Sequence, residues 1–204
     1  FAIEYIKGLQ DFGMISTAKH FPGHGDTQTD SHSSLAMIPS ASSRLWSIEL
    51  NPFIDVAKAG VDAIMIAHVH APDFQPEADR PATLSKFWVT DILRNKIGYN
   101  GTIITDGMGM GGVTKNYADD FAIVETVKAG CDIIIQNYDI VGSIDATRQT
   151  SGGQERCSSF SNRGPRIDVW AGYYDRAKED IIESNERDRH SGTAPVTRID
   201  YGLY

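Results

Sequence analysis

Histidines and aspartates gather in one short stretch near the start of the 204-residue chain. Residues 17–32 read TAKHFPGHGDTQTDSH. This stretch contains three of the six histidines of the chain and two aspartates: His20, His24, His32, Asp26 and Asp30. Imidazoles and carboxylates are the side chains that most often transfer protons in enzymes near neutral pH. The clustering therefore indicates a catalytic or binding loop rather than a role in packing alone.

The pair Asp30 and His32 has the spacing of a proton-transfer unit. Two residues apart on a loop, the carboxylate can fix the tautomer of the imidazole and raise its basicity. A histidine held in this way can donate a proton and later recover it. The alternative is an exposed loop aspartate and histidine, because a spacing of two residues is only weakly specific.

Other side chains of the same stretch have binding or structural interpretations. Lys19 and His20 can supply hydrogen bonds to a polyhydroxyl ligand, although Lys19 also fits a solvated charge at a strand end. His24 and Asp26 lie in a turn bounded by glycines, and they fit residues that shape the loop without touching a substrate.

Asp106 is a second candidate for chemistry, far from the first stretch along the chain. It follows the apolar run 101–105, GTIIT, and precedes Gly107, so little side-chain bulk lies beside its carboxylate. A carboxylate at a strand end suits a nucleophile or an electrostatic stabiliser. The alternative is an aspartate that caps the following turn.

Two further patterns invite a metal or a phosphate. His68 and His70 are two residues apart on an apolar run, so a strand would point both side chains the same way, but no third ligand has a fitting spacing. The glycine-rich run 107–112, GMGMGG, lacks the Lys-Ser/Thr of a phosphate-binding loop and the GxGxxG register. We therefore predict neither a metal nor a cofactor.

Alternating apolar segments predict the elements that position these residues. We expect helices over 1–10, 43–59, 85–96 and 119–128, and strands over 14–21, 61–69, 101–108 and 131–135. Nearly continuous apolar strands between helices are typical of a parallel α/β sheet. Polar residues fall at the carboxyl ends of the strands, at His20, His68, Asp106 and Gln136. In barrels and open parallel sheets alike, that edge binds ligands.

Composition limits the classes of partner. With a net charge of −8, 41% hydrophobic and 23% charged residues, the chain has the make-up of a globular protein without the basic surplus that nucleic acids or anionic membranes require. We expect no nucleic-acid partner and no membrane span, since no run approaches about 20 apolar residues. Cys131 and Cys157 show no zinc spacing, and we expect free thiols rather than a disulfide.

The texture of the chain changes near residue 139. Residues 142–165 have the Gly, Ser and Pro content of loops, and residues 173–190 fit a solvated charged helix. We therefore predict a first domain over 1–138 and a loop-rich tail over 139–204.

Five segments in order sharpen this picture. They are KHFPGHGDTQTDSH, ELNPFIDVAKAGVDAIMIAHV, PATLS, LRNKIGYNGTIITDGMGM and VKAGCDIII. Together they resemble glycoside hydrolase family three, in its bacterial β-N-acetylglucosaminidase branch, over about residues 1–138. The resemblance implies retaining hydrolysis of β-linked N-acetylglucosaminides such as peptidoglycan or chitin fragments, without a cofactor.

The same resemblance assigns roles to individual residues. Asp106 matches the nucleophile of the family, and His32 matches the general acid/base that Asp30 holds in place. Lys19 and His20 match the pair that binds sugar hydroxyls. A histidine thus takes the place of the second carboxyl group of the usual scheme.

The resemblance also implies a (β/α)8 TIM-barrel-type fold, of which this chain carries only the later four βα units. An incomplete barrel leaves strand edges open, which favours self-association that covers them. For localisation, the resemblance leaves both the bacterial cytoplasm and the periplasm or exterior open.

The tail resembles a second family. Residues 141–171, which include VGSIDAT and SSFSNRGPRIDVWA, are similar to the core of subtilisin-like serine proteases, although Ala194 stands where the nucleophilic Ser is expected. A fusion, a misassembled reading frame and omitted segments would each give this join. Two alternative functions follow: a subtilisin-like serine peptidase fragment, or an inactive carbohydrate-binding remnant.

Overall fold

The computed structural model of the chain describes residues 1–27, 31, 34–39, 42–135, 142 and 147. The chain divides into two units, 1–155 and 156–204, and all described residues belong to the first. Asp30, His32, Gln136 and nearly all of the predicted tail lie outside the described residues, so the expectations for them stay predictions.

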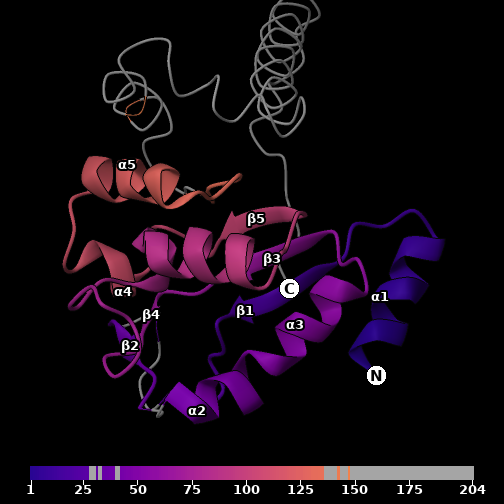
Figure 1. Ribbon diagram of the computed structural model, residues 1–204. Coiled ribbons are helices and arrows are strands. Elements are labelled where there is room, and N and C mark those ends of the chain that lie inside the picture. Colours follow the sequence, from indigo (N-terminus) through magenta and orange to yellow (C-terminus); the bar gives the residue numbers. More distant parts are fainter. Residues whose placement is uncertain (28–30, 32–33, 40–41, 136–141, 143–146, 148–204) are drawn as a thin grey trace, which may run out of the picture. The chain divides into compact units, whose positions relative to one another are not determined.

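Three strands form the central parallel sheet, as the alternation of apolar segments predicts. They are β1 (Thr17–Phe21), β3 (Ala63–Ile66) and β5 (Thr102–Thr105), in the order β1-β3-β5. Both pairings are parallel, and each strand is separated from the next by helical segments (Figure 1). All carboxyl ends therefore face the same edge of the sheet.

The segment 131–135 runs beside β5 on the side away from β3. Ile133 forms a parallel bridge with Ile104, and the Asp132 N–H donates to the Ile103 carbonyl at 2.8 Å. The strand predicted here is therefore a single bridge rather than a regular strand.

A second sheet has two short parallel strands, β2 (Ala36–Met37) and β4 (Val69–His70). The prediction of one strand over 61–69 is wrong, because the apolar run divides into β3 and β4, which belong to different sheets. The chain leaves the first sheet at Ala67 and His68, and Val69 then pairs with Ala36.

Helices connect the strands at the predicted places, although the segment predicted as one helix over 43–59 consists of three. Two of the helices are π-helices, η1 and η3, and one is a 3-10 helix, η2. The bounds are α1 Ala2–Asp11, α2 Ser42–Arg44, η1 Leu45–Glu49, α3 Asn51–Lys58, η2 Ala82–Leu84, η3 Phe87–Lys96, α4 Gly111–Thr114 and α5 Asp119–Ala129. Gly60, Gly98 and Gly130 follow three of these helices with φ of +83°, +80° and +107°, which confirms them as helix stops. No helix of the described part is long and apolar enough to cross a membrane.

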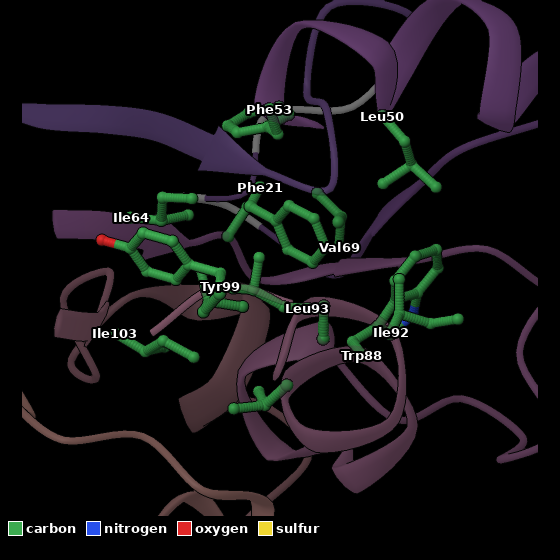
Figure 2. Close-up of a cluster of buried hydrophobic side chains, with 14 of the residues drawn as sticks. Phe21, Leu50, Phe53, Ile64, Val69, Trp88, Ile92, Leu93, Tyr99 and Ile103 are labelled. Atoms are coloured by element: carbon green, nitrogen blue, oxygen red, sulfur yellow. The ribbon is translucent and has the colours of Figure 1, made fainter. Parts of the chain in front are cut away.

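The main core packs around Phe21, at the end of β1 (Figure 2). Its ring meets Phe53 of α3 edge-on at 5.3 Å between centroids and Trp88 of η3 at 6.0 Å. Ile64 of β3 and Leu93 of η3 are fully buried in the same cluster. Burial of large apolar side chains thus fixes the carboxyl end of β1 against two helices.

Candidate active site

His20 and Asp106 meet at the carboxyl edge of the sheet. His20 is the fourth residue of β1, and Asp106 directly follows β5. The distance from His20 Nε2 to Asp106 Oδ2 is 3.6 Å, and their side chains are 29% and 19% exposed. The two residues are thus close together and still reachable by a ligand, as the shared edge of a parallel sheet predicts.

Backbone hydrogen bonds align the strand ends that carry these two side chains. The Ala67 N–H donates to the Phe21 carbonyl at 2.8 Å, which joins the end of β1 to the end of β3. The Asp106 N–H donates to the Ile66 carbonyl at 2.9 Å, which joins the end of β3 to the end of β5. Hydrogen bonds between backbone atoms therefore set the position of Asp106 relative to β1.

The carboxylate of Asp106 has a fixed orientation. Its Oδ1 accepts a hydrogen bond from the Gly107 N–H at 2.8 Å, while Oδ2 faces His20. The bond to Gly107 also fits an aspartate that caps a turn. The contact with His20 is the observation that favours a chemical role, because a turn cap does not require an imidazole.

The loop after β1 is shaped by His24 and Asp26, in agreement with the structural interpretation of these two residues. His24 Nδ1 lies 2.7 Å from Thr27 Oγ1, and its Nε2 lies 2.8 Å from Ser31 Oγ. Asp26 forms an ion pair of 2.9 Å with Arg44. Both nitrogens of His24 are thus used within the loop.

Gly23 allows the sharp turn between His20 and this loop. Its φ is +129°, and its N–H donates to the His20 carbonyl at 2.9 Å. A Cβ at this position would lie 2.9 Å from Cβ of Glu49, closer than side chains tolerate. The peptide bonds Lys19–His20 and Phe21–Pro22, which flank the pair His20 and Phe21, are both cis, a feature that we did not predict. Lys19 itself is exposed.

Ser31 is the described residue between Asp30 and His32, and it is buried. Its carbonyl accepts the Gly112 N–H at 3.0 Å. Gly112 lies in α4, which follows Asp106 along the chain. The residue between the predicted acid/base pair therefore contacts the segment that follows the predicted nucleophile.

His68 is a functional candidate whose surroundings we did not predict. Its Nδ1 lies 2.8 Å from Thr83 Oγ1, and its Nε2 lies 2.9 Å from the Gly107 carbonyl oxygen. Both nitrogens therefore have partners other than a metal. In the part of the chain that the structure describes, no group of three His, Cys, Asp or Glu side chains could hold a metal ion. The sequence gives no signal for the contact between His68 and Gly107, because the acceptor is a backbone carbonyl, which every residue type has.

Two titratable groups with shifted pKa values lie away from this edge. Burial raises the pKa of the Cys131 thiol well above its usual range, so this free cysteine is an inert core residue. Hydrogen bonds from the Ser16 N–H, the Gln10 side chain and the Ser16 hydroxyl lower the pKa of Asp62. These bonds tie α1 and the start of β1 to the segment before β3, which makes Asp62 a structural carboxylate.

Fold and site together define an α/β protein with a carboxylate and an imidazole at the carboxyl edge of a parallel sheet. Residues 1–167 match the Glycosyl hydrolase family 3 N terminal domain. The chain belongs to this family. The match continues past residue 138 into the stretch that resembles subtilisin-like proteases.

Relatives of known name agree with this assignment. A β-hexosaminidase of Idiomarina loihiensis is 37% identical over 143 residues, which are 70% of this chain and 42% of that relative. A β-hexosaminidase of Stenotrophomonas maltophilia is 37% identical over 135 residues, which are 66% of this chain and 39% of that relative. The chain thus spans about two fifths of the length of these relatives.

Solved structures show the same fold. A glycoside hydrolase family 3 β-N-acetylglucosaminidase from Paenibacillus sp. str. FPU-7 has a TM-score of 0.71 and 35% identity, with 98% of this chain and 36% of that chain covered. CbsA from Thermotoga neapolitana has a TM-score of 0.73 and 30% identity, with 83% and 40% covered.

Proposed function

We propose that this chain carries the catalytic half of a retaining glycoside hydrolase that cleaves β-linked N-acetylglucosaminides, with Asp106 as the nucleophile. The observation that carries the proposal is the meeting of Asp106 and His20 at the carboxyl edge of the sheet, 3.6 Å apart. The names of the relatives, β-hexosaminidase and β-N-acetylglucosaminidase, support the class of sugar.

Asp106 would form the covalent intermediate. One carboxylate oxygen attacks the anomeric carbon as the bond from that carbon to the leaving oxygen breaks, which gives a glycosyl-enzyme. The Gly107 N–H at Oδ1 holds the carboxylate in one orientation, which supports attack through the other oxygen. Water then cleaves the ester bond, and the two inversions retain the configuration.

His32 would protonate the leaving oxygen in the first step and take a proton from water in the second, with Asp30 fixing its tautomer. What supports this role is the position of Ser31, between the two residues in the sequence. Ser31 is anchored on one side to the Gly112 N–H and on the other to His24. Ser31 therefore links the loop to α4, the helix that follows Asp106 along the chain.

Lys19 and His20 would bind hydroxyl groups of the sugar. His20 already faces the Asp106 carboxylate, so a sugar that contacts both would have its anomeric carbon near the nucleophile. Such positioning is a large part of the rate advantage of an enzyme.

The test is the release of nitrophenol from a nitrophenyl β-N-acetylglucosaminide. Asp106→Ala is expected to lower kcat by about 10⁴-fold or more, and His32→Ala by about 10²- to 10⁴-fold. Asp91→Ala is the matched control, because Asp91 is a partly exposed carboxylate in η3 that is paired with Lys86 at the start of the same helix. It should leave the rate unchanged.

Because the chain spans about two fifths of its relatives, the assay is also run on a chimera. In the chimera, residues 1–138 replace the matched part of the Idiomarina β-hexosaminidase. Activity in neither protein, or equal activity in Asp106→Ala and the parent, would refute the proposal. If the chain cleaves casein and a serine-directed inhibitor blocks this cleavage, the result would favour the serine peptidase alternative. Saturable sugar binding without turnover would favour the inactive carbohydrate-binding remnant.

We further propose that residues 1–138 form the later four βα units of a (β/α)8 barrel, and that copies of the chain associate through the edge of β1. Within the described residues, only β3 pairs with β1, which leaves its other edge open. Phe12 and Ile15, just before β1, are exposed apolar side chains. Sedimentation should give a mass of twice 22.4 kDa or more, reduced by Ile15→Asp but not by Ile48→Asp. A monomer throughout would contradict this proposal.

A further inference from the structure

His68 is a fully buried histidine with a hydrogen bond at each ring nitrogen. It lies between β3 and β4, at the point where the chain leaves the first sheet. Its Nδ1 contacts Thr83 Oγ1 of η2 at 2.8 Å, and its Nε2 contacts the Gly107 carbonyl oxygen at 2.9 Å. Three segments far apart in the sequence thus meet at one imidazole.

The chemistry of these partners assigns a tautomer to His68. A carbonyl oxygen only accepts hydrogen bonds, so Nε2 must carry the hydrogen that it donates to Gly107. In the neutral ring, Nδ1 then accepts the hydrogen of the Thr83 hydroxyl. The Gly107 carbonyl therefore selects the tautomer, and the Thr83 hydroxyl, which can donate as well as accept, supports it by donating to Nδ1.

Gly107 is also the residue that orients the predicted nucleophile. Its N–H donates to Asp106 Oδ1 at 2.8 Å. Its carbonyl accepts the Met110 N–H at 3.1 Å in addition to the bond from His68. A change at the carbonyl of Gly107 would therefore tilt the residue whose N–H holds the carboxylate.

His68 also lies close to Gly112, the glycine that anchors Ser31. A Cβ added to Gly112 would lie 3.0 Å from His68 Cβ and 3.4 Å from the His68 carbonyl oxygen. The same Cβ would lie 3.0 Å from the Ser31 carbonyl oxygen, which accepts the Gly112 N–H. His68 thus forms a hydrogen bond to the residue after Asp106 and lies beside the glycine that holds Ser31.

We propose that His68 is a positioning residue for the glycosidase reaction, which orients the Asp106 carboxylate through the backbone of Gly107, whose carbonyl bonds to His68 and whose N–H bonds to Asp106. The proposal rests on the proposed function of Asp106. In this proposal His68 does not touch the sugar, and Thr83 acts one step further away, because its hydroxyl donates to Nδ1 of His68.

The first test compares His68→Gln with His68→Asn in the full chain and in the chimera. The amide nitrogen of Gln reaches the place of imidazole Nε2, so it can still donate to the Gly107 carbonyl, whereas the shorter Asn reaches only the place of Nδ1. His68→Asn should lower kcat by about 10- to 100-fold, the usual effect of losing a residue that orients a reacting group. His68→Gln should recover most of this loss, and KM should change little in both.

A residue with a purely structural role would behave differently. Both variants would then lose thermal stability, and kcat per folded molecule would stay at the parent value in each. That result would overturn the proposal, as would equal loss of kcat in the Gln and Asn variants at equal folded fractions.

A second readout does not depend on activity. The exchange rate and proton chemical shift of the Gly107 amide report its hydrogen bond to Asp106. His68→Asn should speed this exchange by about 10-fold, which corresponds to a hydrogen bond weakened by about 1.4 kcal/mol, while His68→Gln should leave it close to the parent rate. If the parent shows no hydrolysis but the amide responds in this way, the proposed function fails, whereas the orientation of the Asp106 carboxylate by His68 stands. An unchanged amide in both variants would refute the positioning role.

The pair Thr83→Val and Thr83→Ser provides the test if both His68 variants fail to fold. Val removes the hydroxyl that donates to His68 Nδ1, and Ser keeps it at the same place. In nitrogen NMR, His68 should carry its hydrogen at Nε2 in the parent and in Thr83→Ser. A hydrogen at Nδ1 in the parent would overturn the assignment, and equal Gly107 exchange in the Val and Ser variants would overturn the supporting role of Thr83.

Discussion

Replacement of Arg94 by Met should destabilise the domain more than any surface change. Arg94 lies in η3 with only 8% of its surface exposed. Its guanidinium donates to the Tyr99 carbonyl at 3.0 Å, to the Gly101 carbonyl and to Asp132 Oδ2. The same Asp132 oxygen accepts the Ile103 N–H of β5 at 2.7 Å. Arg94 thus helps to hold the strand that ends at Asp106.

The expected magnitude follows from what Met leaves behind. Met fills most of the volume of the aliphatic stem, so the main loss is the pairing of Asp132 and of two carbonyl groups. Removal of one partner of a buried ion pair costs about 3 to 5 kcal/mol. Because the Asp132 side chain is 20% exposed, water can replace part of the pairing, and we expect about 3 kcal/mol. For a domain of this size, that corresponds to a melting temperature lower by about 6 to 12 °C.

Urea unfolding followed by circular dichroism measures this loss. Lys86→Met is the matched control, because the Lys86–Asp91 ion pair of 2.8 Å is exposed, and it should cost less than about 1 kcal/mol. The double variant Arg94→Met with Asp132→Asn should lose less unfolding free energy than the sum of the two single variants, since Asp132→Asn removes the carboxylate charge that Arg94→Met leaves unpaired. A loss below about 1 kcal/mol in Arg94→Met, or additive losses in the cycle, would refute this reasoning.

Two further predictions concern acid stability and the core. Asp62 has a pKa lowered by hydrogen bonds from the Ser16 N–H and the Gln10 side chain, so it should stabilise the fold above about pH 4, and this stability should be lost as the pH falls through the lowered pKa. Asp62→Asn should flatten the acid side of the unfolding free energy between about pH 5 and pH 2, and superimposable curves would contradict the prediction. Phe21→Ala should cost about 3 to 5 kcal/mol in urea unfolding, and Phe21→Leu less than about 1.5 kcal/mol. Similar losses in both would contradict this prediction, because they would show that the edge-on contacts of the ring with Phe53 and Trp88, rather than apolar volume, supply the stabilisation.

The sequence predicts the parallel arrangement well, because strands buried on both faces are apolar along their whole length. β3 and β5 lie inside two such runs, and Gly60 and Gly98 end the preceding helices as expected. The sequence does not predict β2 and β4, since strands of two residues have no period to detect. For the same reason the run 61–69 looks continuous, although the chain changes sheet at His68.

The candidate site divides in a similar way. The sequence predicts that His20 and Asp106 lie close together. Both residues lie at the carboxyl ends of strands, and parallel strands have these ends at the same edge of the sheet. The bond from His68 to Gly107 is not predictable, because the residues are far apart in the chain and a carbonyl acceptor leaves no mark on residue type. The catalytic roles of Asp106, His32 and Asp30 and the binding roles of Lys19 and His20 all stay predictions.

The hydrogen bonds that join the ends of the three central strands have a consequence for how this family can diverge. They run from Phe21 to Ala67 and from Ile66 to Asp106 through main-chain atoms only. Mutational drift in the flanking side chains therefore leaves the span between the imidazole and the carboxylate unaltered. Insertions or deletions inside a strand would shift it at once, so we expect homologues to vary the lengths of their connecting loops and to conserve the lengths of these strands.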